Sequence, residues 1–506
     1  MKQKIFSLEK LQKILEKQSE KGKKVVLCHG VFDLLHIGHI KHFEEAKNFG
    51  DILVVTLTPD IHVNKGPKRP AFIEKLRVEA VAALDVVDYV SLNSTSTAVN
   101  VIQKLKPDIY CKGSDYKDNK NDISGQMKEE IRALKKIGGK MVYTGGALFS
   151  SSKLINLSEV YSDVHKLSIK KIKKNYSFQN IKKLIDNFKK MKILIIGETI
   201  IDQYVFCEAL GKSGKEPVLV LQDIKTEEYL GGAAALARHI SPFCKNISLL
   251  SMVGEKGEYL QEIKKKLPKN INFKYIKKKN SPTILKRRFL DNISNNKVLG
   301  VYKINDDILQ NKQDRLFYGM LKKMLPKFDL VIVSDYGHGL ISKRSANVIC
   351  KTSKYLTLNA QINSANIGYH SMRNYKNVNC VIVNEREIQH EMRDKNNKTE
   401  LLMKKLSSQQ KIKNMIVTRG KEGALIYNRK DNKFNSSVAF ADAAVDKIGA
   451  GDAMLSIISL CLKNKFSNEL ALLVGSLAAA QSTESIGNKN SVSKIKILKT
   501  LKHLLK

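Results

Sequence analysis

Lys24-Val-Val-Leu-Cys-His-Gly30 is an apolar stretch that runs directly into a glycine, and Met191-Lys-Ile-Leu-Ile-Ile-Gly197 repeats this arrangement much later in the chain. Each stretch is typical of a buried strand that opens a parallel α/β sheet, because helices cover such strands on both faces. A glycine-bearing loop and a helical pattern follow each of them. Two openings of this kind predict two α/β domains in tandem.

The composition bounds the class of protein. With 506 residues the chain is too long for one ordinary core, and 42% apolar with 27% charged residues indicates a globular chain. The 7 cysteines are scattered and never form a C-x-x-C pair, which argues against a disulfide framework or a zinc knuckle. No apolar run reaches the ~18 residues of a membrane span. We therefore expect a cytoplasmic protein without a membrane partner.

The charge balance is strongly basic, with 88 Lys and Arg against 49 Asp and Glu and a net charge of +39. A surplus of this size raises nucleic acid as a partner. The lysines occur along the whole chain, however, and no stripe of interleaved aromatic residues accompanies them. We expect solvated surface and phosphate-rich small substrates rather than a specific nucleic acid, and a basic nucleic-acid-associated protein remains the alternative from another class.

Apolar stretches alternate with helical patterns in both halves, which predicts doubly wound domains. In the first half the expected strands are Lys24–Cys28, Asp51–Thr56, Tyr89–Ser91, Ile109–Cys111 and Lys140–Thr144. In the second half they are Lys192–Ile196, Leu330–Val333, Cys380–Val383 and Met415–Thr418, with a separate antiparallel lid from Pro217–Ile224 and Ile284–Leu290. The expected domains are residues 1–157 and 191–506, and residues 158–190, rich in Lys, Ser and Asn, are expected to form a linker.

The first candidate site is His36-Ile-Gly-His39, which follows the first strand directly and precedes a helix expected over Ile40–Lys47. Two histidines three apart at a helix start lie on one face, where free amides and the helix dipole favour phosphate. Imidazoles there can donate to phosphate oxygens as charge accumulates during in-line attack. Lys41 and Lys65 could add fixed positive charge. Alone, the two histidines could equally be helix-cap or core residues.

The surrounding sequence resembles the cytidylyltransferase-like nucleotidyltransferases, whose signature is H-x-G-H. The likeness continues in family order through Lys65–Pro70, Arg77, Pro107–Tyr116 and Ser150–Ile155. It implies a Rossmann-like nucleotidyltransferase domain. The implied catalytic residues are His36, His39 and Lys65, and the implied nucleotide-binding residues are Val31, Phe32, Lys41, Arg77, Ser150, Ser151 and Ser152. The serines also read as an ordinary helix N-cap, and both readings can hold together.

The second candidate site is Asp446-Lys-Ile-Gly449-Ala-Gly-Asp452, which precedes the apolar helical run Ala453–Leu462. Gly449, Ala450 and Gly451 allow close backbone approach at a helix N-terminus, which can form an anion hole for a γ-phosphate. Asp452 beside it can take the proton from a sugar hydroxyl as that hydroxyl attacks. A tight turn before a helix is the alternative reading.

This stretch looks like the signature of the ribokinase-type, or PfkB, carbohydrate kinases. The resemblance implies a ribokinase-like domain with a small β lid and Asp452 as the catalytic base. It implies that Asn384 and Glu387 organise magnesium and phosphate, Mg²⁺ being held through phosphate and water. The implied nucleotide- and anion-binding residues are Asn384, Glu387, Thr418, Gly420, Gly449, Ala450 and Gly451, and the implied sugar-binding residues are Asp202, Gly231, Gly232 and Lys286. The implied substrates are ATP, a nucleoside triphosphate (ATP or CTP) and a sugar phosphate.

Together the two halves resemble the bifunctional heptose-7-phosphate kinases and heptose-1-phosphate adenylyltransferases of lipopolysaccharide synthesis, in reversed domain order. The implied product is an NDP-sugar such as ADP-heptose. The chain departs from the kinase pattern at Ile448, where a Thr is usual, and at Asn359-Ala-Gln361, where Asp-Pro-Lys is expected. The alternative is an active nucleotidyltransferase with a catalytically decayed, sugar-binding kinase-like module. An exposed lid strand is a plausible place for homodimer pairing.

Overall fold

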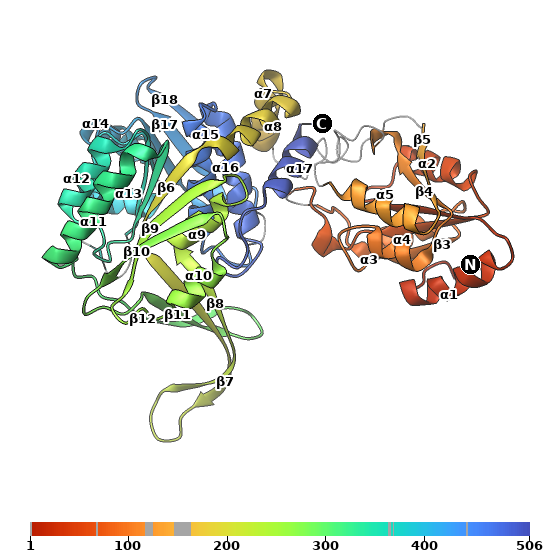
Figure 1. The fold of residues 1–506 in the computed structure, drawn as a ribbon, viewed down its shortest axis with the longest axis horizontal. Coiled ribbons are helices and arrows are strands. Elements are labelled where there is room, and N and C mark those ends of the chain that lie inside the picture. The colour runs from red at the N-terminus through yellow and green to blue at the C-terminus, as the bar shows by residue number, and fades with distance from the viewer. Residues whose placement is uncertain are drawn as a thin grey trace. The chain divides into compact units, whose positions relative to one another are not determined.

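The computed structural model describes residues 3–66, 69–116, 125–145, 163–362, 366–367, 369–441 and 444–505. The chain forms two compact units (Figure 1). Unit 1 comprises Met1–Lys173 together with Ile495–Lys506, and unit 2 comprises Lys174–Lys494. Each unit has a sheet of its own, so the two are described separately.

Unit 1 is built on a five-stranded parallel sheet with the order β3-β2-β1-β4-β5. Its strands are β1 (Val25–Gly30), β2 (Ile52–Leu57), β3 (Tyr89–Leu92), β4 (Ile109–Gly113) and β5 (Lys140–Thr144), and its helices include α1 (Leu8–Ser19), α2 (Ile37–Lys47), α3 (Glu74–Ala82), α4 (Val99–Leu105), α5 (Gln126–Lys136) and α7 (Asp163–Asn175). The five expected strands are confirmed. The strand order reverses between β1 and β4, and sheets of this kind commonly bind ligands at the carboxyl ends of the strands at such a point.

Unit 2 contains a nine-stranded sheet with the order β10-β9-β6-β13-β14-β15-β16-β17-β18. The strands are β6 (Lys192–Gly197), β9 (Asn246–Gly254), β10 (Ile271–Lys278), β13 (Leu330–Asp335), β14 (Leu356–Ala360), β15 (Cys380–Asn384), β16 (Asn414–Thr418), β17 (Ala424–Asn428) and β18 (Lys433–Ser437). The strands from β10 to β16 are parallel, and β17 and β18 are antiparallel. The four strands expected for this sheet are confirmed as β6, β13, β15 and β16, and the sequence analysis missed the other five.

Helices surround this sheet, as the doubly wound prediction requires. They are α8 (Phe178–Asp186), α9 (Ala233–Ile240), α10 (Leu260–Lys266), α11 (Asn311–Met324), α12 (Lys343–Thr352), α13 (Glu385–Met392), α14 (Thr399–Gln409), α15 (Ala450–Lys463) and α16 (Asn468–Ser482). Helices α15 and α16 are almost wholly buried along their apolar runs, which explains why the sequence there is apolar all round.

A second, four-stranded sheet forms the lid of unit 2, with the order β12-β11-β7-β8. Its strands are β7 (Thr199–Lys212), β8 (Leu219–Gly232), β11 (Leu285–Asp291) and β12 (Lys297–Lys303), and the long β7–β8 hairpin projects from the unit (Figure 1). The expectation of a separate lid sheet is confirmed. The expectation that it is wholly antiparallel is wrong, because β11 pairs with β7 in parallel. Between β7 and β11 the chain forms β8 and then the strands β9 and β10 of the large sheet, so β11 returns to the lid by a long connection and not by a hairpin.

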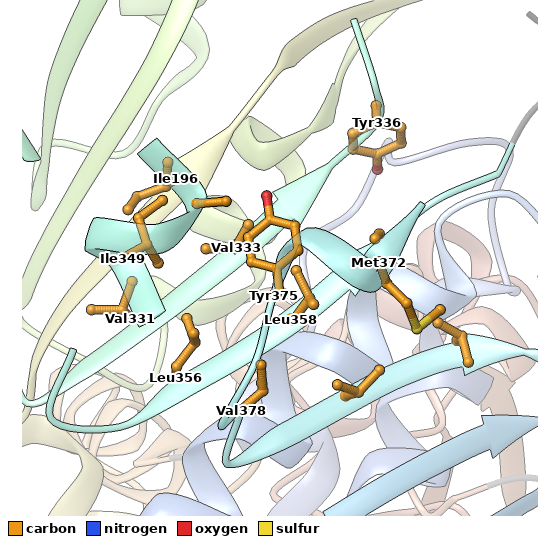
Figure 2. Close-up of a cluster of buried hydrophobic side chains, with 14 of the residues drawn as sticks. Ile196, Val331, Val333, Tyr336, Ile349, Leu356, Leu358, Met372, Tyr375 and Val378 are labelled. Atoms are coloured by element: carbon orange, nitrogen blue, oxygen red, sulfur yellow. The ribbon is translucent and has the colours of Figure 1, made fainter. Parts of the chain in front are cut away.

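A continuous apolar core packs against the large sheet (Figure 2). Val333 of β13 and Leu358 of β14 are at most 1% exposed within it. Tyr375 is also buried there, and its hydroxyl donates a hydrogen bond of 2.6 Å to Asp335. The core therefore fixes the carboxyl end of β13, where Tyr336 leaves the sheet.

Two further segments bear on the domain boundaries. The region expected to be a linker contains helices α7 and α8, and the last helix of the chain, α17 (Lys494–Leu504), belongs almost entirely to the part grouped with unit 1. The boundaries 1–157 and 191–506 accordingly stay a proposal. In the part of the chain that the structure describes, no helix combines the length and apolar character needed to cross a bilayer.

Candidate active sites

The first candidate site lies at the carboxyl edge of the unit 1 sheet, where β1 passes into α2. His36 is the N-cap of α2, and its Nδ1 accepts a hydrogen bond of 3.0 Å from the amide of Gly38. The ring of His39 stacks on the ring of His36, with centroids 4.0 Å apart. The helix therefore begins three residues earlier than expected, and both imidazoles lie at its positive end.

Phe32 shapes the loop between β1 and α2. Its backbone lies in the left-handed region, with φ of 45°, and its ring meets the His39 ring edge-on at 5.4 Å. A Cβ atom on Gly30 would lie 2.9 Å from the tip of the Phe32 ring, so a larger residue at this position would make the ring shift. Phe32 thus holds His39 by packing.

Both histidines are neutral in the folded protein. Desolvation first, and then the charges of His36 and Lys65, lowers the pKa of His39 to about 3. Burial and Lys65 also lower the pKa of His36. Since Nδ1 of His36 accepts a hydrogen bond, the proton of its neutral ring lies on Nε2, which makes Nε2 the donor atom of the ring.

The remaining predicted transferase residues differ in their placement. Lys65 lies near the two histidines, as its effect on their pKa values indicates, whereas Lys41 is exposed on α2. The main-chain oxygen of Val31 points into the fold, where it accepts a hydrogen bond from Arg77. Ser150, Ser151 and Ser152 lie outside the described residues.

Arg77, an implied nucleotide-binding residue, is held by groups inside the fold. Its side chain is fully buried and donates hydrogen bonds to the main-chain oxygens of Val31 at 2.5 Å and Thr58 at 2.9 Å. It also forms an ion pair of 2.6 Å with Asp60 and a hydrogen bond of 3.0 Å to the oxygen of Phe72. These partners hold the loop that carries Val31, and the implied nucleotide contact of Arg77 stays a prediction.

Lys112 is a cation near this site that the sequence analysis did not single out. Its Nζ lies 3.3 Å from the oxygen of His29 and 3.5 Å from Glu130, at the end of β4. After desolvation, its charge is the next cause of the lowered pKa values of His29 and His42. The residue stands within the Pro107–Tyr116 stretch, but only the pairing of β4 with β1 brings it to the histidines.

The second candidate site surrounds the N-terminus of α15 in unit 2. Gly449 is the N-cap with φ of 89°, and a Cβ there would lie 2.2 Å from Oδ1 of Asn488, so only glycine fits. A Cβ on Gly451 would meet no atom within 4 Å, so the first turn borders open space. The first amides of a helix lack partners within the helix. The Ala450 amide donates a hydrogen bond of 3.4 Å to the oxygen of Lys447, and the amides of Gly451 and Asp452 in the same turn can hold an anion.

Asp452 lies in the first turn of α15. Burial, as the largest cause, raises its pKa to about 7, with a smaller contribution from Asp202. Tyr336 donates a hydrogen bond of 3.1 Å to its Oδ1. A carboxylate with a pKa near neutrality, beside a possible anion hole, can act as a general base at physiological pH.

The predicted sugar residues gather on the lid sheet next to Asp452. Asp202 of β7 pairs in register with Lys286 of β11, and a Cβ on Gly231 would lie 2.1 Å from the Asp202 carboxylate. Gly232 has φ of 59°, and a Cβ there would lie 2.3 Å from a main-chain oxygen. Both glycines therefore allow β8 to lie close to Asp202 and to the main chain at Glu198.

Arg288 is a second cation at the sugar position, and the sequence analysis missed it. Its Nη1 forms an ion pair of 2.5 Å with Asp202, and both side chains are nearly buried. Lys286 is also buried, which lowers its pKa, and its Nζ lies over the rings of Tyr302 and Tyr336. Lys286 and Arg288 thus place two cationic side chains beside Asp202, with Glu198 and Asp452 also acting on Lys286.

The N-x-x-E motif forms a reciprocal helix cap. The Asn384 side chain accepts a hydrogen bond from the amide of Glu387 at 2.9 Å, and Glu387 accepts one from the amide of Asn384 at 2.7 Å. Desolvation raises the pKa of Glu387 to about 7. Thr418 pairs in register with Asn384 at the edge of the sheet, and Gly420, with φ of 57°, begins the turn after it.

The residues around Asn384 and Glu387 offer few oxygen ligands for a magnesium ion. Among the described residues no three side chains that favour metal ions gather together, and the capping box already uses oxygens of Asn384 and Glu387. Mg²⁺ commonly takes one or two carboxylates and completes its shell with substrate phosphates and water. The residues present therefore fit an ion that is held mainly by the nucleotide.

The parallel sheet, the lid and the carboxylate beside a helix start define the architecture of a carbohydrate kinase. Residues 190–495, more than half of the chain, match the pfkB family carbohydrate kinase, and residues 27–157 match the cytidylyltransferase-like family. The chain belongs to the pfkB family of carbohydrate kinases and carries a cytidylyltransferase-like domain before that region.

Curated relatives match the transferase part. The bifunctional protein HldE of Sulfurimonas denitrificans is 39% identical over 138 residues, which are 27% of this chain and 29% of that protein. HldE of Citrifermentans bemidjiense is 47% identical over 130 residues, 25% of this chain and 26% of that protein. The chain thus spans less than a third of the length of these relatives, and the comparisons lend no support to the expected reversal of domain order.

Solved structures resemble unit 2 in fold alone. Phosphofructokinase-2 of Escherichia coli in complex with fructose-6-phosphate is 16% identical, with a TM-score of 0.50, and the match covers 62% of this chain and 100% of that one. The same enzyme in complex with substrates and products gives equal values.

Proposed function

We propose that the chain is a bifunctional enzyme that makes an NDP-sugar, with ADP-heptose as the favoured product. The C-terminal part transfers the γ-phosphoryl group of ATP to the anomeric hydroxyl of a sugar or sugar phosphate. The N-terminal part then joins the resulting sugar 1-phosphate to a nucleoside triphosphate, ATP or CTP. The observation that carries the proposal is the presence, in one chain, of a buried base at Asp452 and of neutral stacked histidines at a second helix start.

In the kinase step, Asp452 takes the proton of the sugar hydroxyl as its oxygen attacks the γ-phosphorus. The new P–O bond forms while the bond to ADP breaks, and the amides after Gly449 stabilise the charge on the transferred group. Asp202, Gly231, Gly232 and Lys286 hold the sugar, and Thr418 and Gly420 line the nucleotide position. Bound Mg²⁺ supplies positive charge to the phosphates.

In the transferase step, a phosphate oxygen of the sugar 1-phosphate attacks the α-phosphorus of the nucleoside triphosphate and pyrophosphate leaves. The Nε2–H group of His36 and the imidazole of His39 donate to the phosphate oxygens as charge develops, and Lys65 adds fixed positive charge. Val31, Phe32, Lys41 and the serines 150–152 are proposed to surround the nucleotide.

The test is mass spectrometry of the products formed from a library of sugar phosphates with each of the four nucleoside triphosphates. We expect ADP and a newly phosphorylated sugar, followed by pyrophosphate and an NDP-sugar. Formation of NDP-sugar only from a supplied sugar 1-phosphate, without ADP release from any sugar, would favour the alternative in which the kinase-like part is a decayed binding module.

We also propose a homodimer that forms through the lid. Every residue of β12 is exposed, and this strand is an edge of the lid sheet, so its free backbone groups can pair with a second chain. Sedimentation equilibrium of the whole chain tests this assembly, and a monomer at micromolar concentration would contradict it.

A further inference from the structure

The lid sheet and the turn that precedes α15 meet at one carboxylate, Asp446. Its side chain is 3% exposed and accepts four hydrogen bonds. The donors are Lys297 Nζ at 2.6 Å, the Tyr204 hydroxyl at 3.2 Å, and the amides of Ile448 at 3.1 Å and Gly487 at 3.0 Å. Each carboxylate oxygen receives two of them, so the side chain has one fixed orientation.

The four donors come from two different parts of unit 2. Lys297 lies on β12 and Tyr204 on β7, both in the lid sheet, whereas the Ile448 and Gly487 amides belong to loops beside the start of α15. Burial alone would raise the pKa of Asp446, but the hydrogen bonds from Lys297 and from the two amides outweigh it and lower the pKa overall. Asp446 is therefore an anion that attracts the lid to the loop.

Tyr204 also connects Asp446 with the proposed sugar-binding residue Asp202. The Arg288 guanidinium lies over the Tyr204 ring at 5.6 Å, and Arg288 forms the ion pair with Asp202. On the other side, a Cβ on Gly487 would lie 2.7 Å from the Tyr204 hydroxyl, so this loop packs directly on the tyrosine. A continuous set of side chains thus joins Asp202 to the loop that begins with Asp446.

We propose that Lys297 and Tyr204 are positioning residues for phosphoryl transfer, which hold the Asp446–Gly449 loop in alignment with the sugar site on the lid. The proposal rests on the kinase function proposed above. An attacking hydroxyl and a γ-phosphorus that are bound by different sheets must be aligned closely, and a displacement of about 1 Å can reduce the rate by about 10². Neither residue touches the reacting atoms.

A purely structural ion pair predicts a different result. If Lys297 only stabilises the fold, loss of turnover in a Lys297 variant should follow its loss of stability, because Asp446 is a buried carboxylate. For a positioning role we expect the loss of turnover to exceed the loss of stability, because Asp446 keeps the hydrogen bonds from Tyr204 and from two amides when the ammonium group is absent. Lys303, at the exposed end of the same strand β12, provides a matched control, because its side chain does not reach Asp446 in the described structure.

The experiment compares Lys297→Met, Tyr204→Phe, Lys297→Arg and the control Lys303→Met in the full chain. The readouts are ADP release with a sugar phosphate that wild type turns over, the melting temperature, and nucleotidyl transfer from a supplied sugar 1-phosphate. We expect Lys297→Met to lower kcat at least about tenfold with less than threefold change in KM, while nucleotidyl transfer matches the control. Tyr204→Phe should act in the same direction, and Lys297→Arg should restore part of the loss.

Turnover of Lys297→Met within twofold of Lys303→Met would overturn the positioning role, as would a loss that tracks the melting temperature. Absence of ADP release in wild type, with every sugar phosphate, would instead refute the proposed kinase function. In that case calorimetric titration with ATP compares the same variants, and equal ATP affinity of Lys297→Met and Lys303→Met would overturn the link between the lid and the loop.

Discussion

Burial shifts the pKa values of His39 and Asp452 in opposite directions, and each shift suits the role proposed for that residue. At His39 it lowers the pKa to about 3, so the ring is a neutral hydrogen-bond donor at physiological pH. At Asp452 it raises the pKa to about 7, so the carboxylate is a stronger base than an exposed one. In each case desolvation disfavours the charged form. The neutral donor suits a phosphate that gains charge, and the raised carboxylate suits proton removal.

We expect His39→Ala to lower nucleotidyl transfer by about 10² or more, because a preorganised donor facing developing charge contributes ~2.7–4 kcal/mol. Kinase turnover should be unchanged, since His39 lies in the other unit, and it serves as the control for folding. The measurement is pyrophosphate release from a supplied sugar 1-phosphate. A variant within a few-fold of wild type would remove His39 from the mechanism.

For Asp452 we expect a pH dependence. A base must be ionised, so kcat/KM for ADP release should rise with pH up to about 7 and level off above it. Asp452→Asn should abolish the release at every pH. If wild type and Asp452→Asn release ADP equally with all sugars while the transferase remains active, the kinase assignment fails.

At Ile448 a hydroxyl is missing where the family pattern has Thr, and one net hydrogen bond contributes roughly 0.5–1.5 kcal/mol. Ile448→Thr should therefore raise ADP release by about 2–10-fold. Ile448→Val keeps the branched shape without the hydroxyl and is the control. Equal rates for the two variants would indicate that the hydroxyl does not limit the reaction.

Three helix starts organise the chemistry, and each uses a different cap. Helix α2 is capped by the His36 side chain, α15 begins at Gly449 without a side-chain cap, and α13 carries the reciprocal box of Asn384 and Glu387. A side-chain cap satisfies amides that would otherwise be free, whereas a glycine leaves them for a ligand. Of the three helix starts, that of α15 therefore suits an anion best. The start of α13 is the one whose amides are most fully bonded by its own side chains.

Asn384→Ala separates capping from ligand binding. Loss of an N-cap costs about 1 kcal/mol of stability. Ser467 is the N-cap of α16, where it accepts from the Leu470 amide, and Ser467→Ala should destabilise by a similar amount. If Asn384 also organises magnesium and phosphate, only Asn384→Ala should raise KM for ATP. Equal KM values for both variants, measured beside chemical denaturation curves, would reduce Asn384 to a cap.

The two units have separate sheets and separate candidate sites, each assembled from its own described residues. The last helix, α17, belongs mostly to the part grouped with unit 1, so a cut between residues 160 and 180 would remove Ile495–Lys506 from its unit. Whole chains with one disabled site are the better material for testing independence.

We expect a mixture of His39→Ala chains and Asp452→Asn chains to make NDP-sugar. The first variant still supplies sugar 1-phosphate, and the second still consumes it, because the intermediate can diffuse between chains. The measurement is NDP-sugar formation over time against wild type at the same concentration of working sites. Product formation only when both sites are intact in one chain would demonstrate an obligatory channel.

The sequence alone determined that the chain has two α/β halves and located nine of the strands, and it proposed both candidate sites. These features are local: a buried strand, a glycine and a helix start follow one another within about 15 residues, so neighbouring side chains reveal them. The H-x-G-H pair is an example, because a helix start brings His36 and His39 together without help from the rest of the fold.

Only the tertiary structure decided which charged groups lie together and what they do. It buries Arg77 against main-chain oxygens, brings Arg288 to Asp202 across parallel strands, and joins Lys297 to Asp446 over 149 residues of chain. Local sequence carries no signal for such pairs, since strand pairing and lid placement create them. The pKa values follow for the same reason, because desolvation depends on every segment that packs around a group.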